Sequence, residues 1–328
     1  AVQHLNRARR LAQEVNQRAL EGDIVRCLGN AHYWQNQYNE SQALFEEALA
    51  IHREVGDQRG ELSALNNLAH VLELFGPTQK AVKCYEDAQE ICSKINDKLA
   101  EGVILTNLGG LTAQMGHFQE AQRWLERAVV IRREIGNEEG MAVALFNLGD
   151  VSRQLGRYGQ SLAYHQEALA INKRIKHEGQ TGETLNGLSV LYRELGDYDC
   201  AQAYLAEALT HLPAKDSPRH IRALTDAGLL NHLQGEQTKA LKLAEGALAL
   251  SEELPPLYAA ALKNIGHITA DLGDGGRALK SYQEARRIYD DLGQPHLAVE
   301  PIAGLVSVAL KQKDQTQALD YVEEILEQ

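Results

Sequence analysis

Positive charge is scarce in this 328-residue sequence. It has 33 Lys and Arg residues against 45 Asp and Glu residues, which gives a net charge of -12 and a pI near 5.5. A surface that binds nucleic acid or an anionic membrane needs a local excess of Lys and Arg, and no basic stripe is visible. We therefore expect neither nucleic acid nor membrane among the partners.

Cysteines and long apolar runs are also few. Cys27, Cys84, Cys92 and Cys200 form no C-x-x-C pair and no regular disulfide framework, so a reducing, cytoplasmic setting is favoured over secretion. The longest apolar runs are too short to span a bilayer, and no signal-peptide pattern opens the chain. The sequence predicts a soluble protein.

The motifs of catalytic and metal sites are missing as well. None of the 12 His residues forms an H-x-x-x-H pair or a His-Cys cluster with ligand spacing. The sequence contains neither a G-x-S-x-G turn nor a Gly-rich phosphate loop, and residues 273–276 fit a turn between two helices. We expect no enzyme activity, no metal and no cofactor.

What the sequence does contain is a period of forty residues, marked by Leu28, Leu68, Leu108, Leu148 and Leu188. A period of this length is typical of a stack of one repeated unit. Aromatic residues make up only 5% of the chain, so Ala and Leu supply the packing, as expected where many short helices cross closely.

Each repeat reads as two helices. The first carries apolar pairs three residues apart, which lie on one helical face: Val25 and Leu28, Leu65 and Leu68, Leu105 and Leu108, Leu145 and Leu148, and Leu185 and Leu188. Residues suited to ending a helix tightly follow it: Asn36, Gly76, Gly116, Gly156 and Gly196. The second helix opens with a small residue, and another Ala comes seven positions later in most repeats, so the two helices can approach closely: Ser41, Ala81, Ala121, Ser161, Ala201, Ala240, Ala278 and Ala318, then Ala48, Ala88, Ala128, Ala168, Ala208, Ala247 and Ala285.

This pattern resembles the tetratricopeptide repeat, whose signature places L-G in the first helix and A-x-x-x-F in the second. The matches include Leu28-Gly29, Leu108-Gly109 and Leu148-Gly149, with Ser41-x-x-x-Phe45 and Ala278-x-x-x-Tyr282. The helix-ending Pro is absent, and forty residues exceed the usual thirty-four. That variant is similar to the repeats of kinesin light chains and of bacterial signal-transduction ATPases and transcriptional activators. The resemblance implies an all-α, right-handed superhelical solenoid whose first helices line a concave groove.

The repeats divide the chain into two parts. Residues 1–18 resemble the second helix of a truncated preceding repeat, and residues 19–328 hold eight repeats in one continuous solenoid. Both ends look excised from something longer. The array is less regular from about residue 211, where Pro213 and Pro218, and later Pro255 and Pro256, interrupt the helical pattern. These interruptions indicate either a change of superhelical curvature or harmless loop variation.

The position just before the second core residue of the first helix should face the groove. It is held by Cys27, Asn67, Asn107, Asn147, Gly187, Asp226, Asn264 and Gly304. An Asn side chain offers one acceptor and two donors, the complement of a peptide bond, so a row of them can hold an extended backbone. The alternative is that each Asn bonds a neighbouring helix and orders the stack.

Further first-helix positions should face the same groove. They hold Arg26, Asn30, Tyr33, Trp34, Asn66, His70, Thr106, Phe146, Asp150, Arg153, Asn186, Arg193, Lys263 and His267. Trp34 and Phe146 could anchor apolar side chains. The mixture of charges does not match a clamp for a C-terminal carboxylate, and any one charge is more often a solvated group than a ligand contact.

These features predict a protein- or peptide-recognition scaffold or sensor, part of a larger signalling protein, which captures an extended segment or a partner helix. The alternative is an assembly or autoinhibitory module that packs against its own upstream domain. A phosphate-binding loop before Ala1 would favour the alternative.

Overall fold

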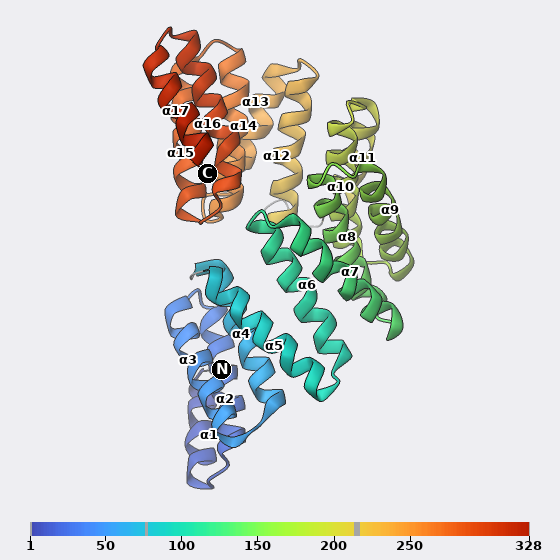
Figure 1. Cartoon of the computed structure of the whole chain (residues 1–328), viewed down its shortest axis with the longest axis vertical. Helices are drawn as coiled ribbons and strands as arrows, with labels where there is room; N and C mark the ends of the chain where they lie inside the picture. Colours follow the sequence, from blue (N-terminus) through green and yellow to red (C-terminus); the bar gives the residue numbers. More distant parts are fainter. Residues whose placement is uncertain (1, 76–77, 213–216, 328) are drawn as a thin grey trace. The chain divides into compact units, whose positions relative to one another are not determined.

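A computed structural model describes residues 2–75, 78–212 and 217–327. These residues form seventeen α-helices and no strand (Figure 1). The predicted all-α repeat fold is confirmed. None of the helices in the described part of the chain is long and apolar enough to cross a membrane.

A single helix, α1 (Val2–Glu14), precedes eight helix pairs in the described residues. The pairs are α2 (Arg18–Tyr33) with α3 (Tyr38–Val55), α4 (Gln58–Phe75) with α5 (Thr78–Ile95), α6 (Lys98–Gln114) with α7 (Phe118–Glu134), α8 (Glu138–Gln154) with α9 (Tyr158–Ile175), α10 (Glu178–Glu194) with α11 (Tyr198–His211), α12 (Pro218–Leu233) with α13 (Gln237–Leu250), α14 (Pro255–Asp271) with α15 (Gly275–Asp291), and α16 (Pro295–Lys311) with α17 (Gln315–Glu327).

The helices group into two compact units. The first holds the described residues of 1–113 and 117–144, and the second holds those of 114–116 and 145–327, so that α8 begins in one unit and ends in the other. Inside each unit a second helix packs against the first helix of the next pair, as α3 does on α4 and α15 on α16. That residues 19–328 form one continuous solenoid stays a prediction.

In several pairs the helices meet where a glycine of the first helix faces a large residue of the second. A Cβ atom on Gly29 would come within 2.6 Å of the Phe45 ring, and one on Gly266 within 2.5 Å of the Tyr282 ring. The predicted small residues of the second helices surround these contacts and are buried. Their small size lets the helices approach closely, because a larger side chain would hold the backbones apart.

The residues that end the helices adopt the backbone conformation expected of them. Asn36, Gly116, Gly156 and Gly196 have positive φ angles of 59°, 80°, 70° and 79°. Gly76 and Pro213 lie outside the described residues. Pro218 and Pro255 each begin a helix, where a missing N–H costs nothing and the fixed φ of proline favours the first turn.

Substituting Gly266 tests the close contact. We expect Gly266→Ala to lower the free energy of unfolding by about 1–3 kcal/mol, because the new methyl group overlaps the buried Tyr282 ring. Gly246→Ala is the matched control in α13, since no atom lies within 4 Å of its Cβ position. The control should gain about 0.5–1 kcal/mol from the better helix propensity of Ala. Urea unfolding of both variants measures the difference, and equal effects would contradict it.

Candidate functional site

Asparagines of successive first helices bond one another in the first unit. Nδ2 of Asn67 on α4 donates to Oδ1 of Asn30 on α2 at 3.2 Å, and Nδ2 of Asn107 on α6 donates to Oδ1 of Asn66 on α4 at 3.3 Å. All four side chains are half-buried. The structure thus brings together four residues that the sequence placed on one face.

These two hydrogen bonds leave some donors and acceptors of the asparagine side chains available. The donor Asn67 keeps one N–H and its carbonyl oxygen, and the acceptors Asn30 and Asn66 each keep an NH₂ group. Asn107 also forms a hydrogen bond with the side chain of Tyr85 on α5. The bonds join one repeat to the next, which is the contact expected of a stack-ordering asparagine. The groups that remain could still bind a peptide backbone, so the contacts are compatible with both readings.

Asn147 belongs to the second unit, on the part of α8 that follows residue 144, and is half-buried. That Asn67, Asn107 and Asn147 form one column stays a prediction. Phe146 beside it is half-buried, with its ring centroid 5.5 Å from that of the buried His165. Part of the Phe146 ring therefore already packs within the unit.

Aromatic side chains gather where α2 ends. Trp34 is 82% exposed, and its ring centroid lies 5.5 Å from that of Tyr33, with the two rings nearly perpendicular. The Tyr33 hydroxyl is 3.1 Å from Nε2 of His70 on α4. Arg26, two turns earlier on α2, lies 3.5 Å from Asp23 of the same helix. Trp34 is thus an apolar group offered to solvent.

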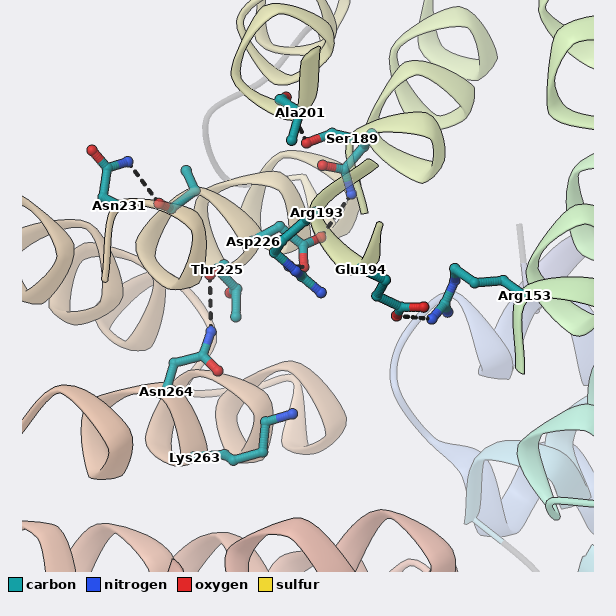
Figure 2. A network of polar contacts seen from close by, with 12 residues as sticks. Arg153, Ser189, Arg193, Glu194, Ala201, Thr225, Asp226, Asn231, Lys263 and Asn264 are labelled. Atoms are coloured by element: carbon teal, nitrogen blue, oxygen red, sulfur yellow. Dashed lines mark hydrogen bonds and ion pairs between the residues drawn. The ribbon is translucent and has the colours of Figure 1, made fainter. Parts of the chain in front are cut away.

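Asp226 of α12 is the centre of a polar network in the second unit (Figure 2). Its Oδ2 accepts a hydrogen bond of 2.8 Å from Asn186, and its Oδ1 lies 3.2 Å from Nη1 of Arg193. Both donors come from α10, so one carboxylate holds two side chains of the preceding first helix. The side chains of Asp226 and Arg193 are 19% and 13% exposed.

Arg153 extends this network from α8. Its guanidinium forms an ion pair with Glu194 of α10, and its Nε lies 3.8 Å from Oδ1 of Asp150 on its own helix. Burial would lower the pKa of Arg153, but the carboxylates of Asp150 and Glu194 outweigh it and raise the pKa. Arg153 is therefore charged, and its guanidinium is held by ionic contacts within the protein.

Asn186 and Asn264 are buried, contrary to the prediction that they face a groove. They are 6% and 2% exposed. Asn264 donates to the backbone carbonyl of Thr225 at 2.9 Å, because α14 packs against α12 and covers the amide (Figure 2). Asn186 donates to Asp226 as described. For these two positions the stack-ordering role is the one that the contacts fit.

A second network joins α14 to α16. Nζ of Lys263 lies 2.6 Å from Oε2 of Glu300, and Nε2 of His267 lies 3.2 Å from Oε1 of the same carboxylate. The buried Tyr282 hydroxyl is 2.9 Å from Nδ1 of His267. Burial alone would raise the pKa of Glu300, but the bond to His267 and the charge of Lys263 hold it at about 2.

The carboxylates of Glu194 and Glu300 were missed from the sequence. Each lies about one repeat after the cation it binds, 41 residues after Arg153 and 37 after Lys263. Opposite charges at that spacing are the signal that could have found them. Within the described residues no cluster of three or more His, Cys, Asp or Glu side chains could hold a metal ion.

Comparison with known proteins agrees with this architecture. The sequence profile of the tetratricopeptide repeat family matches residues 21–94, 60–134, 140–214 and 180–253, together more than half of the chain. No curated protein matches the sequence.

Several solved structures share the fold. A Rap protein complexed with Competence and Sporulation Factor superposes with a TM-score of 0.66 at 18% identity, covering 84% of this chain and 77% of its own. A STAND signal-transduction ATPase from Pyrococcus horikoshii with a tetratricopeptide repeat sensor gives 0.61 at 20%, covering 88% and 46%. A tetratricopeptide repeat protein from Parabacteroides merdae gives 0.59 at 17%, covering 86% and 98%.

Removing the Asp226 carboxylate tests whether it holds two repeats together. We expect Asp226→Ala to lower the free energy of unfolding by about 2–4 kcal/mol, because it strands the buried Asn186 amide and the Arg193 guanidinium without their acceptor. Arg287→Ala, which breaks exposed ion pairs with Glu284 and Asp291, should leave the free energy of unfolding nearly unchanged. Chemical denaturation gives both values, and similar losses would show that Asp226 is an ordinary surface charge.

The low pKa of Glu300 predicts a pH dependence. A carboxylate whose folded pKa lies below its unfolded value of about 4.3 stabilises the protein above that pH and loses the contribution as pH falls toward the folded value. With a folded pKa of about 2, the stability difference between wild type and Glu300→Gln should shrink between about pH 5 and pH 2. Thermal melts across this range measure it, and a pH-independent difference would rule the ion pair out as its cause.

Proposed function

This chain belongs to the tetratricopeptide repeat family, and we propose that it captures an extended peptide segment or a partner helix along the face of its first helices. Chains of such repeats are protein-interaction scaffolds or sensors. The proposal adds a location, the first-helix residues around Asn67, Asn107 and Asn147, and a mode of binding through side-chain amides.

The paired asparagines are the observation that carries the proposal. The bonds from Asn67 to Asn30 and from Asn107 to Asn66 hold the amides in place, so less side-chain entropy is lost when a ligand binds. The N–H and C=O groups that these bonds leave on Asn30, Asn66 and Asn67 can pair with the C=O and N–H groups of a peptide bond. Such recognition reads the backbone and tolerates many side chains.

Exposed Trp34 supports the proposal from the same unit. A tryptophan that is 82% exposed leaves a large apolar surface in water, and Trp is among the residues that most often dominate binding energy at protein interfaces. It follows Tyr33, whose hydroxyl lies beside His70 of the next first helix. An apolar side chain of the partner could pack on the indole while the amides hold its backbone.

The solved neighbours support a role in recognition. The Rap protein was crystallised with Competence and Sporulation Factor, and the Pyrococcus horikoshii protein carries its repeats as a sensor. The second of these also favours the alternative, an autoinhibitory module on an upstream effector domain, because this chain spans only 46% of that protein. If the alternative holds, the array should bind an effector domain of its own polypeptide added in trans.

Capture from native cell extract tests the site and the partner together. The variant Asn67→Ala/Asn107→Ala/Asn147→Ala should capture at least tenfold less partner than wild type, since each amide is proposed to form hydrogen bonds with the ligand backbone. Its free energy of unfolding should fall only by about 0.5–1.5 kcal/mol for each hydrogen bond removed. Mass spectrometry of the captured proteins and thermal melts give the two readings.

The matched control removes three amides from second helices, Gln89→Ala/Gln122→Ala/Gln166→Ala, and should bind like wild type. A large fall in melting temperature with undiminished capture would mean that the asparagines only order the stack. Equal loss of capture in the two triple variants would show that binding does not depend on the first-helix face.

A further inference from the structure

His165 occupies a core position that most other repeats give to a large apolar or aromatic residue. It lies on α9 at the register of Phe45 and Tyr282, four residues after the small residue that opens the helix. The side chain is fully buried. Cβ atoms on Gly149 of α8 and Gly187 of α10 would come within 2.8 and 2.9 Å of its ring. The imidazole therefore fills a space shaped for a nonpolar ring.

Two nitrogen atoms lie near one carboxylate oxygen at this place. Nε2 of His165 lies 3.6 Å from Oδ1 of Asp150, and Nε of Arg153 lies 3.8 Å from the same oxygen. Neither ring nitrogen of His165 nor Nε of Arg153 has a hydrogen-bond partner among the described residues, although all three are buried. Buried polar atoms are seldom left in this state, so the arrangement requires an explanation.

The charges around the imidazole come from two helices. On α8, Asp150 and Arg153 face it, and α10 packs against it through Gly187 and supplies Glu194, which pairs with Arg153. Burial lowers the pKa of His165, the Asp150 carboxylate raises it, Arg153 lowers it, and the net shift is downward. The ring is therefore harder to protonate than an exposed imidazole.

We propose that His165 is a positioning residue that makes the candidate binding face respond to protons, an inference that rests on the function proposed above. With the ring neutral, Arg153 is the only one of the two groups whose positive charge attracts Oδ1 of Asp150. When a proton adds to the ring, the imidazolium N–H donates to that oxygen and its charge repels Arg153. Asp150 then turns from Arg153 to His165, and Arg153 is left with Glu194 of the next repeat.

The protonation of buried His165 would therefore change the contacts of Asp150 and Arg153, two residues of the candidate face. Asp150 and Arg153 are first-helix side chains that are 37% and 14% exposed, whereas His165 is fully buried. Acidification would change the charge arrangement of the face without any contact between His165 and a ligand. A histidine with a purely structural role in the core would leave Arg153 unaffected by pH.

Titration by nuclear magnetic resonance on the full chain tests the proposal without a ligand. The His165 ring signal is assigned by its loss in His165→Phe, a variant that copies Phe45 of the first repeat. We expect it to titrate below the ordinary value of about 6.5. Asp150→Asn should move the midpoint lower and Arg153→Gln should move it higher. A midpoint at or above the ordinary value, or one that neither variant moves, would overturn the proposal.

The Nε–H signal of Arg153 reports whether the change reaches the candidate face. It should shift with the same midpoint as His165 in the wild type and stay constant through that pH range in His165→Phe. An Arg153 signal that ignores the titration of His165 would refute the positioning role. Should the Phe variant not fold, His165→Leu serves instead, because Leu125 holds this register in the third repeat, against Gly109.

Stability provides an independent reading. A histidine that is harder to protonate in the folded than in the unfolded state makes the unfolding equilibrium constant rise up to tenfold for each pH unit below about 6.5, until the folded midpoint is reached. This rise should appear in the wild type relative to His165→Phe, and its absence would contradict the proposal. None of these measurements involves a partner. A negative result here would therefore not contradict the proposed peptide binding, and a negative capture experiment would not contradict the role of His165.

Discussion

The close approach of two helices at a glycine is the contact on which the rest of the structure depends. Where Gly29 faces Phe45 and Gly266 faces Tyr282, the missing side chain lets a large ring fill the space between paired helices. Dense packing at this point fixes the rotation of each first helix about its axis. That rotation decides which polar side chains point to the next repeat, so the hydrogen bonds between repeats follow from an apolar contact within them.

The fold could be predicted from the sequence because the same pattern of core, small and helix-ending residues recurs in most repeats. Leucines three residues apart, small residues seven apart, and Asn or Gly at the helix ends identify two helices and a tight turn, and a chance pattern would not recur every forty residues. The left-handed residues Lys176 and Lys313 could not be foreseen in this way, since lysine has no preference for that conformation. At these two positions the packing of the repeat sets the left-handed backbone conformation, even though lysine does not favour it.

The candidate site was only partly predictable. Alignment of the repeats gives the direction in which a side chain leaves its helix, and this was enough to bring Asn30 and Asn67 together. It does not tell how closely the neighbouring helix covers that direction, which is why Asn186 and Asn264 are inside. Partners such as Glu300 come from the following repeat, at spacings that vary with each connection, so no single period reveals them.

The contacts between successive first helices change along the chain, although α2–α4 and α4–α6 share an amide–amide bond. Amide meets amide between α2 and α4, amide and guanidinium meet carboxylate between α10 and α12, amide meets backbone carbonyl between α12 and α14, and ammonium meets carboxylate between α14 and α16. The polar groups at a contact between first helices therefore help to specify which two repeats can meet there. Repeats with one shared scaffold could otherwise shift along the stack or exchange with those of a second molecule during folding. Mismatched polar groups would disfavour an exchange between repeats whose contacts differ.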